Sequence, residues 1–183
     1  MQSEESLVAQ AKRGDEAAFS GLYEANFDKI YRYIALKIGD KIEAEDLTQQ
    51  VFLNALKSIS SFKWQGAPFS AWLFRIAHNQ VVDYLRKRSR SPTVPLDERT
   101  PEVGSGDPQA LTEISFSMEQ VNLATKKLTR LQSEVISLRF AGGLSTAEVA
   151  RILGKREGAI KALQHSAVIA LRKALGVDLD EKR

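Results

Sequence analysis

Apolar residues recur along the first half of this sequence at spacings of three and four, the period of an amphipathic helix. No strand-like alternation of apolar and polar residues competes with this pattern. Asp15 is a suitable N-cap for a first helix around residues 19–23, and a second follows through residues 27–34. Two more helices are predicted over residues 44–59 and, starting near Pro68, over residues 69–90.

The second half of the sequence repeats the helical period in three segments. The first, residues 128–140, is closed by a Gly-Gly pair, and the second, residues 145–153, begins with the Ser145 and Glu148 pattern of a capping box. A turn at Gly154 leads into a long helix over residues 156–175. This spacing is typical of a helix-turn-helix DNA reader, and an ordinary helical hairpin is the alternative.

Proline separates the two halves, because four of the five prolines lie between positions 92 and 108, together with two glycines. We therefore predict an all-α protein made of two small helical domains joined by a flexible, acidic linker. The predicted boundaries are 1–90 for the first domain, 91–112 for the linker, 113–176 for the second domain and 177–183 for a tail.

Charge follows the same division. Residues 51–90 carry seven basic and one acidic side chains, and residues 118–183 carry twelve basic and seven acidic ones, whereas residues 91–117 carry one and five. Two basic blocks indicate two separate contacts with a polyanion such as DNA. A signal peptide and an apolar run of membrane-spanning length are absent from the sequence, so a cytoplasmic location without membrane insertion is expected.

Catalytic chemistry has few candidate groups in this sequence. Cysteine is absent, and the two histidines, His78 and His165, fall in different predicted domains, where both are interpreted as helix-surface residues. A metal-dependent nuclease using Asp46 or Asp83 is the enzymatic alternative, but no second ligand lies at metal-binding spacing. No enzyme activity, cofactor or metal is expected.

Two features of the first domain favour nucleic acid. Asn79, Asp83, Arg86 and Arg90 follow one another at helical spacing and form one polar face on segment 69–90. In the short loop before it, Phe62 and the neighbouring tryptophan are aromatic side chains of the kind that stack on unpaired bases. A solvated charged face and a buried aromatic core are the alternatives.

Taken together, three segments resemble bacterial sigma factors of the extracytoplasmic-function (ECF) group, and the resemblance covers almost the whole chain. The region-two helix that docks on RNA polymerase resembles the segment AEDLTQQVFLNAL. The reader of the downstream promoter element resembles FSAWLFRIAHNQVVDYLRKRSR, and the region-four helix-turn-helix resembles STAEVARILGKREGAIKALQH. The resemblance implies a factor that binds core RNA polymerase at its clamp and flap regions. It also implies recognition of the −10 and −35 promoter elements, as duplex and melted strand, and an anti-sigma factor as partner.

The same resemblance assigns roles to individual residues. The residues implied to contact polymerase are Asp46, Leu47, Gln49, Gln50 and Phe52. Those implied to engage the downstream element are Phe62, Lys63, Trp64, Asn79, Asp83, Arg86, Lys87 and Arg88. Those implied to engage the upstream element are Ser145, Arg151, Lys155, Arg156, Lys161, Gln164, His165 and Arg172.

The sequence departs from the family pattern at a few positions. Gln50 stands where the family often has an acid, and Lys155 where an apolar residue often begins the turn. Leu163, Ser166 and Val168 replace frequent arginines, which leaves the upstream reading helix poor in cations. A free-standing helix-turn-helix regulator, which would bind its operator without polymerase, remains the alternative function.

Overall fold

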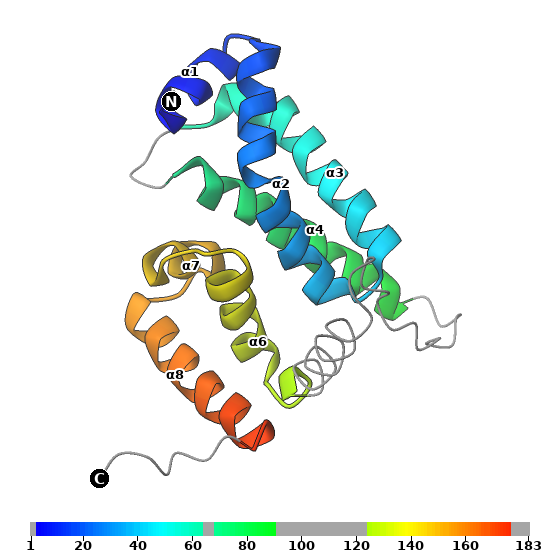
Figure 1. Cartoon of the computed structure of the whole chain (residues 1–183), viewed down its shortest axis with the longest axis vertical. Helices are drawn as coiled ribbons and strands as arrows, with labels where there is room; N and C mark the ends of the chain where they lie inside the picture. Colours follow the sequence, from blue (N-terminus) through cyan, green and yellow to red (C-terminus); the bar gives the residue numbers. More distant parts are fainter. Residues whose placement is uncertain (1–2, 64–67, 91–123, 177–183) are drawn as a thin grey trace, which may run out of the picture.

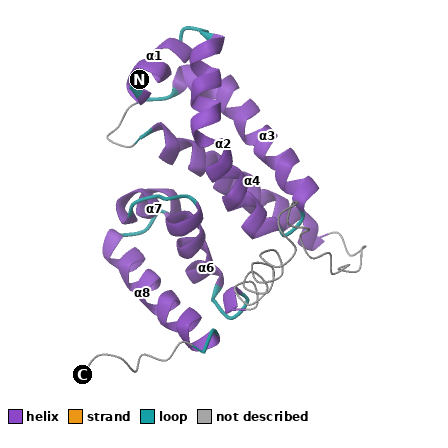
Figure 2. Ribbon diagram, in the orientation of Figure 1, coloured by secondary structure: helices purple, strands orange, loops and turns teal. Residues whose placement is uncertain are grey.

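The computed structural model describes residues 3–63, 68–90 and 124–176, and every regular element in these ranges is helical (Figures 1 and 2). The predicted linker and tail lie outside the described residues. The elements of the N-terminal unit are α1 (Glu4–Ala11), α2 (Glu16–Ile38), α3 (Lys41–Ser58), the short 3₁₀ helix η1 (Ile59–Ser61) and α4 (Phe69–Arg90). Those of the C-terminal unit are α6 (Arg130–Ile136), the π-helix η2 (Ser137–Ala141), α7 (Thr146–Leu153) and α8 (Glu157–Ala174).

Local signals explain where the N-terminal helices begin and end. The Asp15 carboxylate accepts a hydrogen bond from the backbone N–H of Ala18, which confirms the predicted N-cap, and Asp40 caps α3 in the same way. Between α2 and α3 the chain turns at Gly39, whose φ of 74° is left-handed and suits glycine. The two helices predicted before residue 35 form the single helix α2, because no breaker separates them and the buried stripe from Leu22 to Ile34 is continuous.

Helices α2, α3 and α4 pack side by side and enclose the core of the N-terminal unit (Figure 1). Tyr33, Phe69 and Phe74 are its largest fully buried side chains. Helix α4 has the bounds that its apolar period predicts. Its inward residues, such as Leu73 and Val81, are buried, and its opposite face remains polar, as expected of an amphipathic helix.

The C-terminal unit has the helix-turn-helix arrangement that the spacing predicts. Ser145 and Glu148 form the predicted capping box, with the Ser145 hydroxyl bonded to the Glu148 N–H and the Glu148 carboxylate to the Ser145 N–H. Gly154 ends α7 with a left-handed φ of 62°, and α8 then packs on α7 through the buried side chain of Ile160. The segment predicted as one helix over 128–140 changes from α to π geometry at Ser137.

The two units do not stand apart, because their buried apolar residues form one hydrophobic cluster. η2 packs on α2, and α7 packs on α4. Gly142 lies at this contact: a Cβ atom there would lie 2.9 Å from Cε1 of Phe74 and 2.6 Å from the carbonyl oxygen of Leu138. A larger residue at position 142 would therefore collide with its own turn and with the neighbouring unit.

Candidate nucleic-acid and polymerase-binding surfaces

Helix α3 presents a mixed polar and apolar outer face. Asp46, Gln49 and Gln50 are exposed on it, and Gln50 donates a 3.0 Å hydrogen bond to the Asn54 side chain one turn later. Three large apolar side chains are also exposed on this helix: Ile42, Leu53 and Leu56, with exposed fractions of 72%, 49% and 50%. Helical residues normally keep such side chains inward, so this row of exposed apolar groups is the type of surface that another protein covers.

Two of the residues predicted to contact polymerase lie deeper than expected. Phe52 is buried, and its ring packs on Tyr23 and Phe27, so its contact with polymerase stays a prediction that this conformation does not display. Leu47 is half-buried against the same core. Sequence alone did not separate these positions from their neighbours, whereas exposure identifies Leu53 and Leu56 as the apolar groups available on this face.

The outer face of α4 carries the polar residues predicted to engage the downstream element. Asn79, Asp83, Arg86, Lys87 and Arg88 are all exposed there. Arg86 and Asp83 form a 3.1 Å ion pair whose side chains are 60% and 57% exposed. A pair so open to solvent contributes little to stability, and its guanidinium remains accessible to an anion.

In the aromatic loop before α4, the described residues agree with the buried-core alternative. Phe62 is buried rather than presented to bases, because its ring packs on Phe69 and Trp72, and its carbonyl oxygen accepts a 2.7 Å hydrogen bond from Lys12. Lys63 is exposed. Trp64 lies outside the described residues.

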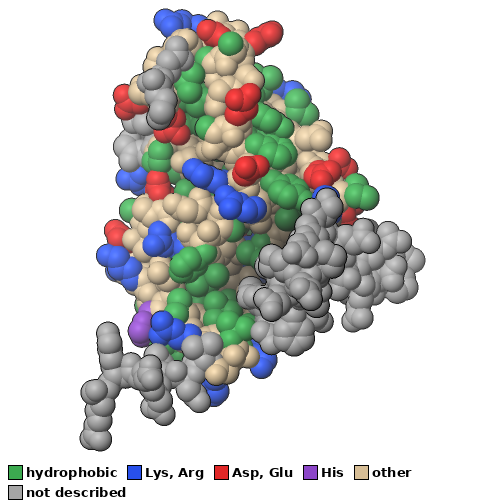
Figure 3. Space-filling model, in the orientation of Figure 1, with side chains coloured by type: hydrophobic (Ala, Val, Ile, Leu, Met, Phe, Trp, Pro, Cys, Tyr) green, Lys and Arg blue, Asp and Glu red, His purple; other side chains and the backbone are tan. Residues whose placement is uncertain are grey.

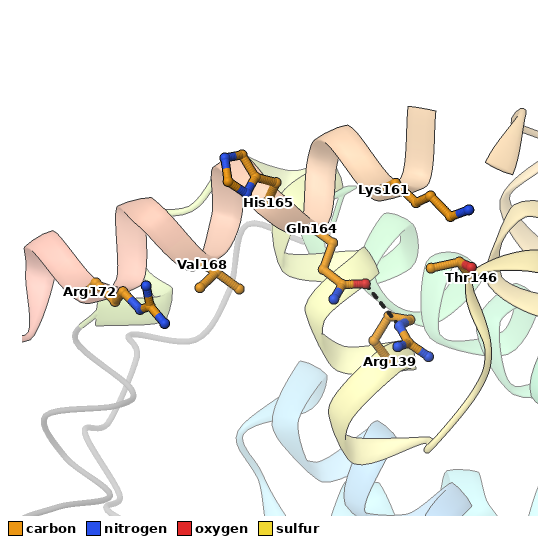
Figure 4. Close-up of a pocket in the computed structure, with 7 residues that line it drawn as sticks. All are labelled: Arg139, Thr146, Lys161, Gln164, His165, Val168 and Arg172. Atoms are coloured by element: carbon orange, nitrogen blue, oxygen red, sulfur yellow. Dashed lines mark hydrogen bonds between the residues drawn. The ribbon is translucent and has the colours of Figure 1, made fainter. Parts of the chain in front are cut away.

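On the C-terminal unit, an open pocket lies between α8 and the segments before it (Figure 4). The pocket combines six polar or cationic side chains from α8, α7 and η2 with the apolar side chain of Val168. Its lining residues are Arg139, Thr146, Lys161, Gln164, His165, Val168 and Arg172. Four of the eight residues predicted to engage the upstream element therefore lie together on one concave face: Lys161, Gln164, His165 and Arg172.

Arg139 is a member of this pocket that sequence reasoning missed. Its Nε donates a 2.9 Å hydrogen bond to Oε1 of Gln164, and its Nη1 donates to the carbonyl oxygen of Leu144 (Figure 4). Arg139 thereby ties α8 to the turn before α7. Gln164, which the resemblance implies engages the upstream element, is half-buried and bonded to this arginine.

Lys161 has a defined position at the edge of the pocket. It forms a 3.0 Å ion pair with Glu157, whose carboxylate also accepts a hydrogen bond from the Thr146 hydroxyl. Hydrogen bonds from Lys161 and Thr146 and the lysine charge lower the pKa of Glu157. The remaining predicted residues, Arg151, Lys155 and Arg156, are exposed around the turn, whereas the Ser145 hydroxyl caps α7.

Between the two units lies a polar cluster that sequence reasoning did not find. We call it the Glu134 cluster: Tyr33 and Lys37 from α2, His78 from α4, and Glu134 from α6. Glu134 Oε1 lies 2.5 Å from the Tyr33 hydroxyl and 2.9 Å from Nδ1 of His78, and Oε2 lies 2.8 Å from Nζ of Lys37. The carboxylate accepts all three bonds, so the proton of the histidine ring is assigned to Nδ1.

Electrostatics in the Glu134 cluster follow from its geometry. Burial by itself would raise the pKa of Glu134, but the His78 bond, the charge and bond of Lys37 and the Tyr33 hydroxyl together lower this pKa to about 2. Burial, followed by the nearby carboxylate, raises the pKa of Tyr33. His78 is thus an interface residue rather than the helix-surface residue predicted, and no local sequence signal links it to Glu134, 56 positions away.

Within the described ranges, no group of three or more His, Cys, Asp or Glu side chains is placed to hold a metal ion. In the same part of the chain, no helix has the length and apolar character needed to cross a membrane. The residues that gather on the surfaces above are polar, cationic and apolar groups suited to contacts with macromolecules.

Comparison with known proteins gives these surfaces a class. Residues 22–91 match the family model of Sigma-70 region 2, and residues 124–173 match that of Sigma-70, region 4. The first range contains α3 and α4, and the second contains the helix-turn-helix. The fold and its surfaces thus define a protein built from two Sigma-70 domains.

Individual relatives identify the family within the Sigma-70 proteins. The chain is 41% identical to the ECF RNA polymerase sigma factor BldN of Streptomyces coelicolor over 94% of its own length and 66% of that relative. It is 32% identical to the ECF RNA polymerase sigma factor SigW of Bacillus subtilis, covering 92% of this chain and 94% of SigW. The chain belongs to the ECF RNA polymerase sigma factor family. A promoter-directing sigma factor is therefore supported over a free-standing helix-turn-helix regulator.

Solved structures share the architecture. The sigma factor RpoE in complex with the anti-sigma factor NepR from Bartonella quintana is 26% identical, with a TM-score of 0.67, and the match covers 87% of this chain and 98% of RpoE. CnrH in complex with the cytosolic domain of CnrY has the same TM-score of 0.67 at 24% identity, covering 94% of this chain and 96% of CnrH. The latter similarity concerns the fold alone.

Proposed function

We propose that the N-terminal unit, residues 1–90, binds core RNA polymerase and opens the downstream promoter element, while residues 113–176 grip the upstream element as duplex. A linker over residues 91–112 joins the two. The protein acts as a non-enzymatic initiation factor in the cytoplasm.

The polymerase contact is assigned to the outer face of α3. Its exposed polar residues Asp46, Gln49 and Gln50 lie on the same helix as the exposed leucines Leu53 and Leu56. This uncovered mixed face is the observation that carries the proposal, because a free-standing DNA-binding protein has no need of it. An apolar row with polar residues around it fits the anatomy of a protein interface.

The DNA contacts are assigned to the other two surfaces. On α4, Asn79 offers an amide suited to base edges, while Arg86 and Lys87 offer cations to the phosphates. On α8, Lys161 and His165 line the pocket, and Arg172 lies further along the same helix (Figure 4). The basic side chains visible over the C-terminal unit in Figure 3 agree with a contact to a polyanion.

A protein partner that restrains this factor is also proposed. RpoE, to which the chain is similar, was solved in complex with an anti-sigma factor. We infer an anti-sigma factor for this chain as well, which would act by covering the α3 face or by holding the two units together.

Run-off transcription tests the proposal. Core polymerase plus the full-length protein should produce transcripts from specific genomic fragments, whereas core polymerase alone should not. Binding of a fragment by the isolated protein, without any transcript in the presence of core polymerase, would favour the free-standing regulator instead.

A further inference from the structure

The Glu134 cluster is the most deeply buried group of charged residues in the described part of the chain, and it has no role in the contacts proposed above. Lys37, Glu134 and His78 have side-chain exposures of 9%, 12% and 18%. The cluster joins three helices, of which α2 and α4 belong to one unit and α6 to the other. It lies beside the apolar contact between Phe74 and Gly142.

We propose that the Glu134 cluster holds the free protein in a closed state that cannot span both promoter elements, and that these bonds must break before the upstream element is bound. This inference rests on the proposed function, since it concerns two DNA contacts made at the same time.

Helix packing shows why the closed state is too short. Helix α4, which carries Arg86, packs on α7, and α7 packs on α8, which carries Lys161. Packed helix axes lie about 8 to 10 Å apart, so α4 and α8 are held within about 20 Å of each other near α7. Along α4, Arg86 lies 12 residues beyond Phe74, or about 18 Å at 1.5 Å per residue. The −10 and −35 elements are about two turns of duplex, or about 70 Å, apart, which the closed arrangement does not reach.

The chemistry of the contact suits reversible opening. The hydration that the charges of a buried ion pair lose on burial offsets part of what their attraction gains, and the pair fixes the relative orientation of its partners. On opening, water solvates the released Glu134 and Lys37 again, which offsets part of the cost of exposing the apolar residues that the two units share. The cluster therefore selects one closed geometry without making opening prohibitive.

Distance measurements on the full-length protein test the inference directly. The chain contains no cysteine, so Arg13→Cys and Lys173→Cys, both at exposed positions outside the proposed contacts, can carry spin labels for pulsed dipolar spectroscopy. The free protein should give one short, narrow distance distribution. Glu134→Gln, which keeps the shape of the side chain but removes its charge, should raise the open fraction about tenfold, since a charged hydrogen bond is lost.

Glu24→Gln is the matched control, because Glu24 is exposed on α2, and it should leave the distances unchanged. Circular dichroism shows whether Glu134→Gln keeps its helicity. If Glu134→Gln folds poorly, Lys37→Met breaks the same cluster, and Lys29→Met, at an exposed position, is its control. A broad distribution in the wild-type protein, or a narrow one in both cluster variants, would overturn the inference.

Transcription then separates this inference from the proposed function. With core polymerase and promoter DNA, Glu134→Gln should reach half-maximal transcript at a lower protein concentration than wild type. If no variant supports transcription although the distances change as expected, the proposed function fails and the closed state stands. If wild type transcribes and the cluster variants neither open nor shift the concentration, the closed-state inference fails alone.

Discussion

The Tyr33 hydroxyl donates a 2.5 Å hydrogen bond to the carboxylate of Glu134, 101 positions later in the chain. Their protonation states match this arrangement, because the pKa of Tyr33 is raised by burial and the pKa of Glu134 is lowered to about 2. The phenol therefore remains a donor and the carboxylate an acceptor throughout the neutral range. The bond links the two Sigma-70 domains of the protein through groups that sequence patterns do not pair.

Acid should weaken the folded state through Glu134. A folded pKa of about 2, against an ordinary value of 4.5, means that the stabilisation is complete above the ordinary value and is lost as pH falls through about 2. The contribution at neutral pH is on the order of 3 kcal/mol. Urea unfolding at pH 7 and again at pH 2.5 measures this contribution. The free energy of unfolding of the wild type should exceed that of Glu134→Gln at pH 7, and the difference between them should shrink markedly at pH 2.5.

The substitution Glu24→Gln corrects this experiment for general acid effects, since Glu24 is exposed on α2. Its difference from wild type should be small at both pH values. A gap between wild type and Glu134→Gln that stays constant from pH 7 to pH 2.5 would contradict the lowered pKa of Glu134.

Gly142 should resist substitution for steric reasons. In Gly142→Ala, the new methyl group would lie 2.6 Å from the Leu138 carbonyl oxygen and 2.9 Å from the Phe74 ring, closer than packed atoms allow. We expect a loss of about 1 to 3 kcal/mol in the free energy of unfolding, measured in urea. Gly158→Ala on α8 is the control: nothing lies within 4 Å of its added methyl group, so it should stabilise the helix by up to about 1 kcal/mol.

Local pattern was sufficient for most of the fold. The apolar period predicted α4 with its observed bounds, and the short-range chemistry of Asp15, Ser145 and Gly154 predicted two N-caps and a C-cap. These features depend on residues within about four positions of one another. The same locality explains the missed Glu134 cluster, because its partners are brought together by packing between the two units.

Aromatic residues assigned to contacts lie deeper in the structure than the polar ones. Phe52 and Phe62 lie in segments that resemble contact motifs, yet both rings are buried, because an aromatic side chain satisfies the core as readily as a partner surface. The sequence analysis missed Arg139 because this residue lies outside the helix-turn-helix motif. Its place in the pocket depends on the π-helix η2 (Ser137–Ala141), which carries it. Charged and amide residues at helical spacing, such as Asn79 and Arg86, were placed on an exposed face as expected.

The exposed leucines of α3 should matter for polymerase and little for folding. Leu53 and Leu56 are about half exposed in the free protein, so replacing both with serine should change the free energy of unfolding only slightly. If α3 docks on polymerase, the double substitution should lower affinity for core enzyme at least about tenfold, since serine cannot gain the apolar burial that the exposed part of each leucine would gain on docking. Fluorescence anisotropy with core polymerase measures this, and Leu36→Ser, at a 40% exposed site on α2, is the control.

Arg86 and Lys87 should act on strand opening. Both are exposed on α4, whereas the polymerase contact is assigned to α3, so replacing them with alanine should leave polymerase affinity nearly unchanged. Loss of two phosphate contacts should lower promoter opening at least about tenfold. Permanganate reactivity of unpaired thymines reports opening, and a pull-down reports polymerase binding. Equal losses in the two assays would refute the assignment of separate surfaces to these tasks.

Arg139 and Lys161 should affect upstream binding in different ways, although they line the same pocket. Lys161 is a surface cation, so Lys161→Ala should weaken duplex binding uniformly across sequences and reduce the slope of log affinity against log salt by about one, with little change in stability. Arg139 holds α8 through Gln164 and the Leu144 carbonyl, so Arg139→Met should also lower stability and sequence preference. Binding of upstream duplexes over a salt series, together with urea unfolding, distinguishes the effects of Lys161→Ala and Arg139→Met. If Arg139→Met reduced only the slope of log affinity against log salt and kept full stability, Arg139 would be a phosphate contact, and its bond to Gln164 would have no part in positioning α8.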